Sequence, residues 1–317
     1  MNLNTNHLKP RFSTLFIAVF GSFFTLATLA GLGWFGLTHI KREVKSEVLN
    51  NLSSRLPQAV KMIKIWRRAS KVDVKSIASN RALQNYIFAL IKKVNQGEIP
   101  SHVDSTELKV IREYLEPLLK NFSYIGFSIF NSEGLGVGSS FDEAIGSRWL
   151  VSTLEGERFF RSVSLGNTAI TLPFKANIEL PDREGVIRKN SPTILIGSPI
   201  NYSTGKFSAA IVFHLRPEEV FTDIFAISNF NKSGETYAFD KTGRMLTASR
   251  FDDDLRRLGL LGSSTASLLN LVVKDPGGNL LEGFKPRLKT DQQPFTRMIK
   301  SAHQGESGSD IEGYRDY

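Results

Sequence analysis

Residues 233–246 read SGETYAFDKTGRML, and this order of residue types indicates a β-hairpin. Tyr237 and Phe239 lie two residues apart, as on one face of a strand, and Leu246 continues that face beyond the turn. Asp240 and the glycine three residues later are turn formers, because aspartate hydrogen-bonds its own backbone and glycine tolerates positive φ. We therefore predict strands over residues 236–240 and 244–249, joined by a turn at 241–243.

The same strand–turn–strand pattern occurs earlier in the chain. Residues 125–130 are predicted to form a strand, residues 131–134 (NSEG) a turn, and residues 135–138 the returning strand. Two hairpin-led modules in tandem give an α+β fold. Further strands are predicted over residues 169–174, 193–200 and 207–215.

Before the first hairpin, apolar residues recur every three or four positions, as on one face of a helix. This spacing predicts a long helix over residues 41–94, with Pro57 as a kink or a break because proline removes a backbone donor. A shorter helix is predicted over residues 105–120, with Ser105 or Asp104 as its N-cap.

An uncharged stretch of 27 residues, Phe12 to Thr38, precedes the long helix. About 20 apolar residues span a bilayer, so this stretch predicts a transmembrane helix. A cleaved signal peptide is the alternative, since Lys9 and Arg11 precede the stretch, but its apolar region is normally shorter. Residues 31–36 match the dinucleotide-binding fingerprint G-x-G-x-x-G. That fingerprint works only as a turn between a strand and a helix, so within a membrane helix it predicts no dinucleotide site.

The net charge of +9 is concentrated next to this apolar stretch. Residues 41–93 carry 13 Lys and Arg against three acids, whereas the residues after 93 sum to −3. A nucleic-acid-binding domain carries its basic surface on a folded module, so we expect no nucleic-acid partner and interpret this charge as a helix near anionic lipid.

The orientation in the membrane is not decided by charge. Positive-inside counting weakly places the large part of the chain, after the apolar stretch, in the cytoplasm, but that rule is weakest before a long domain.

The residue types give little support to catalysis or metal binding. The chain has no cysteine, and its five histidines are scattered without zinc-site spacing. His214 ends an apolar strand and is interpreted as a core or edge residue. Asp252, Asp253 and Asp254 precede Leu-Arg-Arg, which is typical of a helix start, with a calcium site as the alternative. We expect no metal, no cofactor and no enzymatic activity in this chain.

The best candidate for ligand chemistry is the segment that begins at Arg158. There Arg158 and Arg161 flank Phe159 and Phe160, and two guanidinium groups beside two rings suit a carboxylate or phosphate with an apolar part. The alternative is a helix whose phenylalanines lie in the core and whose arginines face solvent. The predicted ligand site consists of Tyr124, Arg158, Phe159, Phe160, Arg161 and Thr171.

Residues 233–246, with the Ser-Arg-Phe of residues 249–251, resemble the membrane-proximal half of double Cache domains, which are extracytoplasmic sensors of bacterial receptors. Residues 275–278 (DPGG) and 313–317 (GYRDY) resemble one branch of that family, found in front of kinases and nucleotide cyclases. The resemblance covers about residues 40–317. It implies two PAS-like antiparallel-sheet modules on a long stalk helix, in a dimer anchored to the bacterial inner membrane.

On this basis the chain is expected to contain a cytoplasmic tail (1–11), a transmembrane helix (12–38), a stalk helix (39–100), a membrane-distal module (101–222) and a membrane-proximal module, incomplete at its C-terminus (223–317). Family members continue with a second membrane helix and an output domain such as a histidine kinase, a nucleotide cyclase or a chemoreceptor module. The sensor modules are expected to lie in the periplasm or outside the cell.

The resemblance implies that the distal module binds a small molecule and that the dimer passes the signal across the membrane. Relatives that bind amino acids carry Arg-x-Trp-Tyr in the corresponding helix, whereas residues 157–160 here read ERFF. A standard amino-acid ligand is therefore in doubt. The alternative function is a membrane-tethered structural or partner-binding protein with a degenerate, ligand-free pocket.

Overall fold

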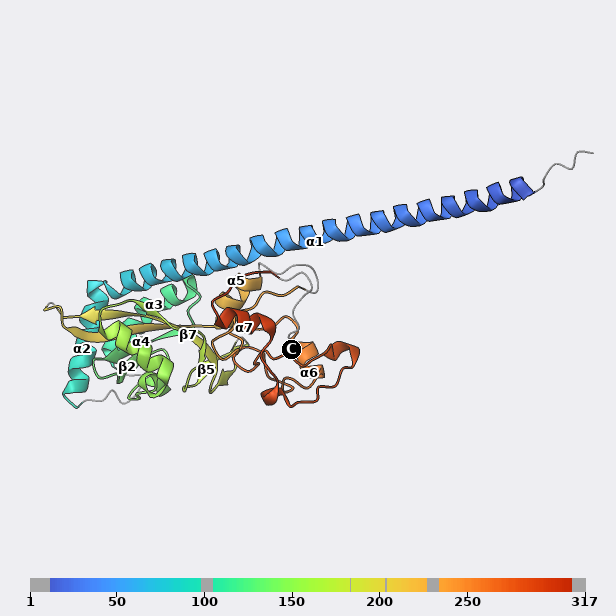
Figure 1. Cartoon of the computed structure of the whole chain (residues 1–317). Helices are drawn as coiled ribbons and strands as arrows, with labels where there is room; N and C mark the ends of the chain where they lie inside the picture. Colours follow the sequence, from blue (N-terminus) through green and yellow to red (C-terminus); the bar gives the residue numbers. More distant parts are fainter. Residues whose placement is uncertain (1–11, 98–104, 183, 203, 227–233, 310–317) are drawn as a thin grey trace, which may run out of the picture. The chain divides into compact units, whose positions relative to one another are not determined.

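The computed structural model describes residues 12–97, 105–182, 184–202, 204–226 and 234–309 (Figure 1). The chain divides into two compact units, one centred on the residues up to Ser54 and the other on Arg55–Gly308. The helices are α1 (Phe12–Ala78), α2 (Arg81–Asn95), α3 (Thr106–Asn121), α4 (Leu154–Ser164), α5 (Asp223–Ala226), α6 (Asp252–Arg257) and α7 (Arg297–His303). Single turns are η1 (Asp142–Ala144), η2 (Leu150–Ser152), the π-helical η3 (Glu218–Thr222), η4 (Leu280–Glu282) and η5 (Thr290–Gln292).

The apolar N-terminal part of α1 is long enough to cross a membrane. Among the described residues it is the one helix with this length and composition, with a mean hydropathy of 1.4 over an apolar window of which none is buried. A signal sequence near the N-terminus has the same character.

The break in the predicted long helix lies at Ser79–Asn80 and not at Pro57. Helix α1 continues through Pro57 to Ala78, and the side chain of Asn80 caps α2 by accepting a hydrogen bond from the Leu83 N–H. A proline removes only one donor from a long ladder, whereas an Asn cap supplies a partner to a helix start. The predicted break at Pro57 was therefore wrong. The cap residue Asn80 decides where α1 ends and α2 begins.

The central sheet is antiparallel throughout, in the order β2-β1-β8-β7-β3, with β4 pairing to β7. Residues 192–201 and 207–215 form its two longest strands, β7 and β8, which pair along most of their length. A two-stranded ribbon, β5 with β6, lies outside this sheet. The strands are β1 (Gly126–Asn131), β2 (Gly136–Ser139), β3 (Ala169–Ile170), β4 (Phe174–Lys175), β5 (Leu180–Pro181), β6 (Ile187–Arg188), β7 (Pro192–Asn201) and β8 (Phe207–Leu215).

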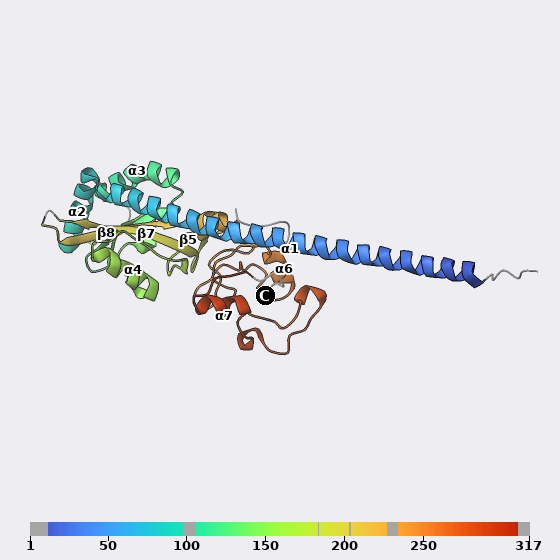
Figure 2. The ribbon, with the colours of Figure 1, turned by 45° about the horizontal axis from the view of Figure 1, so that its top comes forward.

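The two faces of the sheet belong to two hydrophobic cores, because successive side chains on a strand point to opposite faces. Phe127 and Phe213 are directly opposite on β1 and β8 and pack with residues of α1, α2 and α3. Ser128 and Val212 form the next pair, and Val212 belongs to the core beneath α4. Figure 2 shows α3 and α4 on opposite sides of the sheet. The first module is therefore a sheet between two helical layers.

The second predicted hairpin is present, but it forms bridges in place of strands. Phe239 pairs with Met245, and the Leu246 N–H donates to the Ala238 carbonyl at 2.8 Å. Two further bridges join Arg244 to Val272 and Lys274 to Phe295, and residues 234–309 contain no other strand pairing among those described. A small core that contains Met245, Leu255, Leu271, Val273 and Ile299 holds this module together.

The α+β class, the first hairpin and the strands at 193–200 and 207–215 were predicted correctly. Ser105 caps α3 by accepting from the Leu108 N–H, as predicted. The predicted strand over residues 169–174 is divided into β3 and β4. Pro173 lies between them, and a proline cannot donate to a ladder.

Candidate functional site

The first turn of helix α4 is fixed by a side-chain cap and by close packing on η2. The Thr153 hydroxyl caps it by accepting from the Gly156 N–H at 3.1 Å. Gly156 is buried, and a Cβ at this position would lie 1.9 Å from the Leu150 carbonyl oxygen. Buried Phe159 and Val163 follow at helical spacing and face the core. The helix therefore presents one apolar stripe to the sheet and its charged residues to solvent.

The two predicted arginines lie on the solvent side of α4. Both Arg158 and Arg161 are exposed. Arg161 forms an ion pair with Glu157 at 2.8 Å, one helical turn away, with 71% of the arginine side chain exposed. This arrangement agrees with the alternative interpretation of the segment, in which the phenylalanines lie in the core and the arginines face solvent. A role of the arginines in ligand binding stays a prediction.

Three other predicted residues, two on α4 and one beside β7, are buried or half-buried. Phe159 is buried over Gly197 of β7, where a Cβ would lie 2.7 Å from the ring. Phe160 is half-buried and contacts Phe130 edge-on at 6.5 Å between ring centroids. Thr171 is buried, and its hydroxyl accepts from the Leu195 N–H at 2.9 Å, so it extends the pairing of β7.

Tyr124 lies on the other side of the sheet. Its ring packs on Phe213 at 4.8 Å, within the core formed with α1, α2 and α3. Burial, with the carboxylate of Asp73, raises the pKa of the Tyr124 hydroxyl above its ordinary value. The structure therefore does not bring Tyr124 together with Phe159, Phe160 and Thr171.

A buried polar cluster beneath α4 was missed by the sequence analysis. His214 Nε2 lies 3.0 Å from Ser128 Oγ, which in turn lies 3.0 Å from Ser139 Oγ. All three side chains are fully buried. Trp149 packs beside this cluster, with its ring centroid 5.6 Å from that of His214. The available signal was the alternation of strand β8, which places His214 on the same face as Val212, beside the serine-bearing hairpin.

The proton positions in this cluster follow from its geometry. Ser139 Oγ donates to the Phe127 carbonyl at 2.8 Å and accepts from the Phe141 N–H, so its only proton is committed. The proton between the two serines must then come from Ser128, and the proton between Ser128 and His214 must come from Nε2. Complete burial lowers the pKa of His214 from 6.5 to about 3, so the ring is neutral. Its Nδ1 therefore carries a lone pair and no proton.

Two atoms next to this cluster are buried without a hydrogen-bond partner. They are Nδ1 of His214, an acceptor, and Nε1–H of Trp149, a donor; in the part of the chain that the structure describes, neither has a partner. The hydroxyl of Ser208, on the same strand as His214, is the third such atom. Buried polar atoms are nearly always paired, so a donor and an acceptor left open in neighbouring rings mark a place for a ligand or a water.

A separate cleft of about 500 Å³ lies at the end of α1. Its lining includes Lys71 and Lys75, the hydroxyl residues Thr168 and Ser198, and Asn167. Burial and then the nearby Arg67 lower the pKa of Lys71. Lys75 also lies in the last turn of α1, where a cation is favourable without any ligand. Its position therefore does not by itself indicate a ligand in this cleft.

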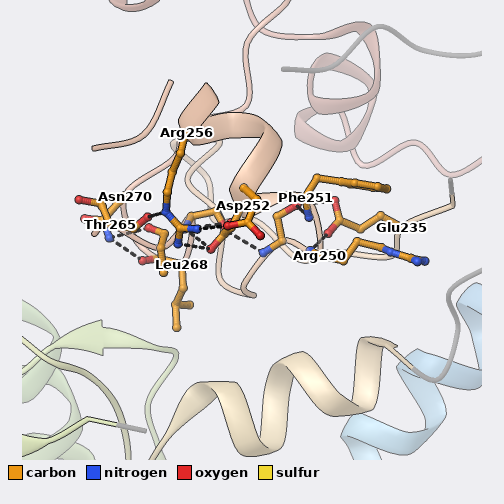
Figure 3. A network of polar contacts seen from close by, with 12 residues as sticks. Glu235, Arg250, Phe251, Asp252, Arg256, Thr265, Leu268 and Asn270 are labelled. Atoms are coloured by element: carbon orange, nitrogen blue, oxygen red, sulfur yellow. Dashed lines mark hydrogen bonds and ion pairs between the residues drawn. The ribbon is translucent and has the colours of Figure 1, made fainter. Parts of the chain in front are cut away.

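The three aspartates of α6 serve the structure of the second module. Asp252 accepts from the Ser267 N–H at 3.2 Å and forms an ion pair with Arg256 (Figure 3). Asp253 and Asp254 pair with Arg256 and Arg257. Nearby, the Arg250 N–H donates to Glu235 at 2.7 Å. These carboxylates start a helix and tie together neighbouring loops, as the helix-start interpretation predicted.

No family model and no curated protein matches the chain, whereas solved structures do. The sensor domain of the V. cholerae histidine kinase DctB is 12% identical with a TM-score of 0.40, and the match covers 59% of this chain and 61% of that domain. The ligand-binding domain of the Campylobacter jejuni chemoreceptor Tlp3, in complex with L-norvaline, is 13% identical with a TM-score of 0.39, over 70% and 75%.

A third structure is the ligand-binding domain of the Pseudomonas fluorescens chemoreceptor CtaA in complex with L-valine, at 11% identity and a TM-score of 0.37, over 66% of this chain and 76% of that one. All three are sensor or ligand-binding domains, the class that the sequence resemblance predicts. This chain spans less than two thirds of the DctB domain. At these identities and TM-scores the likeness assigns neither a ligand nor an activity to this chain.

Proposed function

We propose that this chain is the extracytoplasmic sensing part of a single-pass bacterial membrane receptor. A small molecule binds in the first module, between α4 and the sheet, and the change is passed on by a dimer to an output domain. The chain itself catalyses no reaction. The apolar part of α1 supports the membrane anchor, since it is long enough to span a bilayer and none of its apolar window is buried.

The observation that carries this proposal is that two buried atoms, Nε1–H of Trp149 and Nδ1 of His214, have no hydrogen-bond partner among the described residues. A buried donor or acceptor without a partner costs about 1–3 kcal/mol. Here two such atoms belong to neighbouring rings in one core. A ligand that forms hydrogen bonds with both atoms removes that cost. The free energy recovered in this way would favour its binding.

The position of His214 suggests how binding would reach the stalk helix. His214 lies near the end of β8, and the chain continues from there into η3. Phe221 of η3 meets Trp66 of α1 edge-on, with ring centroids 6.4 Å apart. The core beneath α4 is packed with side chains, so a ligand must shift α4 or the strand end to enter. That shift would reach α1 along the chain from β8 into η3 and through the contact of Phe221 with Trp66.

The test is a ligand screen on the full chain in detergent micelles. Organic acids, amines, amides, alcohols, nucleobases and sugars are added singly, and the melting temperature is measured, followed by calorimetric titration of each hit. At least one class should raise the melting temperature. Trp149→Phe should weaken that binding about threefold to tenfold, because it removes one hydrogen bond. Trp34→Phe, in the apolar part of α1, is the matched control and should bind normally.

Two results would count against this proposal in different ways. If no class binds while the protein is folded, the sensing function fails and the membrane-tethered partner-binding protein takes its place. If a ligand binds and only Arg158→Ala or Arg161→Ala weakens it, sensing stands, but the ligand is held by the arginines of α4, as the sequence analysis predicted.

A further inference from the structure

The two buried atoms without a partner, Trp149 Nε1–H and His214 Nδ1, also determine which chemical group could form a hydrogen bond with both. Trp149 Nε1–H can only donate a hydrogen bond. Because Nε2 of His214 holds the ring proton toward Ser128, Nδ1 can only accept. A group that satisfies both must accept from the indole and donate to the imidazole. Hydroxyl and amide groups do both, whereas a carboxylate can only accept and an ammonium can only donate.

The surroundings of the pair argue against a charged ligand. Among the described residues, no Lys, Arg, Asp or Glu side chain is buried. The rings that contact Trp149 and His214 are Phe130 at 5.8 Å and Phe141 at 5.3 Å, both apolar. A charge placed here would lose its water and find no opposite charge, which is strongly unfavourable. An uncharged apolar body, in contrast, gains by burial against these rings.

We propose that the ligand of this site is uncharged and carries a hydroxyl or amide group on an apolar body. The group accepts from Trp149 Nε1–H and donates to His214 Nδ1, while the body packs against Phe130 and Phe141. This inference rests on the proposed sensing function and narrows its ligand class. It departs from the anionic ligand that the arginines of α4 led the sequence analysis to expect.

The experiment uses matched probes that share one ring and differ in charge. Benzamide and benzyl alcohol are the uncharged probes, and benzoate and benzylamine are their charged counterparts. Each is titrated into the full chain, labelled with ¹⁵N at tryptophan, in detergent micelles. The chain has three tryptophans, so three indole signals are expected, and Trp149→Phe and Trp66→Phe assign them. The indole N–H signal reports directly on the donor that the proposal invokes.

At least one uncharged probe should shift the Trp149 signal with saturation, while the signals of Trp34 and Trp66 stay in place or respond less. Its affinity, measured by calorimetric titration, should fall about threefold to tenfold in Trp149→Phe and by a similar factor in His214→Phe, since each loses one hydrogen bond. Where His214→Phe does not fold, Trp149→Phe alone decides, and an unchanged affinity in that variant contradicts the site.

The remaining outcomes separate the ligand class from the sensing function. Binding of benzoate or benzylamine at Trp149, equal to or tighter than that of the uncharged probes, overturns the ligand class but leaves sensing intact. If no probe moves the Trp149 signal although the wider screen finds a ligand, the class is again wrong and sensing stands. A Trp149 N–H that contacts only a bound water and no probe overturns the inference. If the wider screen is also empty, both proposals fail.

Discussion

Arg161 and Phe159 lie two positions apart on α4, and their environments differ completely. Phe159 is buried over Gly197, whereas Arg161 is exposed and forms a surface ion pair with Glu157. Surface ion pairs of this kind contribute little to stability. Buried aromatic rings contribute much more, because their removal loses both the apolar burial and the packing around it.

The first prediction compares these residues by stability. Phe159→Ala should lower the free energy of unfolding by about 3–5 kcal/mol, since it leaves a cavity between α4 and β7. Arg158→Ala and Arg161→Ala should change it by less than about 0.5 kcal/mol. Urea unfolding of the full chain in detergent, followed by tryptophan fluorescence, measures all three. A loss in the arginine variants comparable to that in Phe159→Ala would mean that these arginines hold the fold.

The second prediction concerns His214 and pH. Its pKa is about 3 in the folded protein and 6.5 when unfolded, so the unfolded chain takes up the proton first as the pH falls. The stability that depends on a neutral His214 is therefore complete above about pH 6.5 and is lost progressively toward pH 3, by up to about 1.4 kcal/mol per pH unit. Urea midpoints at about pH 7 and about pH 5 measure this loss.

His214→Gln should reduce that difference between the two pH values, because glutamine does not titrate. The exposed His303→Gln is the control and should lose stability between the two pH values as the native chain does. Equal losses in the native chain and in His214→Gln would show that His214 is protonated in the folded state, contrary to its burial without a counter-charge.

At the scale of elements, the packing of α4 depends on two glycines, one in its first turn and one on β7. Gly156 lets the first turn of α4 approach Leu150, and Gly197 leaves room on β7 for the ring of Phe159. Glycine is needed at both positions because a neighbouring atom occupies the space that a Cβ would fill. The backbone conformation is not the reason. Gly156 therefore limits how closely α4 approaches η2, and Gly197 limits how closely the ring of Phe159 approaches β7.

The third prediction tests this close approach. In Gly197→Ala the new Cβ would lie 2.7 Å from Phe159 and 3.2 Å from the Ile211 carbonyl oxygen, and that carbonyl belongs to β8. We expect a loss of about 1–3 kcal/mol in the free energy of unfolding, as for other overpacked cores. Adding Phe159→Leu should recover part of it. Gly308→Ala, with open space around its Cβ, is the control and should be neutral.

At the scale of the molecule, the two modules share contacts within one compact unit. Leu246 and Leu268 of the second module belong to the core that also contains Phe213 of the first. The Ala248 N–H donates to the Thr222 hydroxyl at 3.0 Å, and Lys175 donates to Asn270 at 2.7 Å. A ligand bound in the first module, as proposed, would therefore act on the second module as well as on α1.

The fourth prediction concerns the orientation of the chain in the membrane. Because the chain has no cysteine, single cysteines can report on accessibility. Thr204 and Ser307 are exposed, one in each module, and are suitable sites. Both Thr204→Cys and Ser307→Cys should react with a membrane-impermeant thiol reagent in intact spheroplasts. Reaction only after lysis would place the modules in the cytoplasm, as the positive-charge count favours.

Local patterns in the sequence determined the elements, and through them the class of fold. The apolar, β-branched runs of β7 and β8, the turn residues of the first hairpin and the Ser105 cap act within a few residues, so they can be recognised without knowing what packs where. The uncharged stretch at the N-terminus is similar, because a bilayer responds to composition and length alone. The second module shows the limit of this reasoning, since its hairpin forms bridges where strands were predicted.

Only the tertiary structure decided the candidate site. The sequence brought Arg158, Arg161 and Tyr124 forward because charged and aromatic residues close together suggest a ligand, yet helix phase turns the arginines to solvent and sheet register places Tyr124 on the far face. His214, Ser128 and Trp149 lie far apart along the chain and meet through strand pairing and the packing of the intervening loop. Whether a buried nitrogen finds a partner depends on every neighbour that folding brings near it, and no local pattern contains that information.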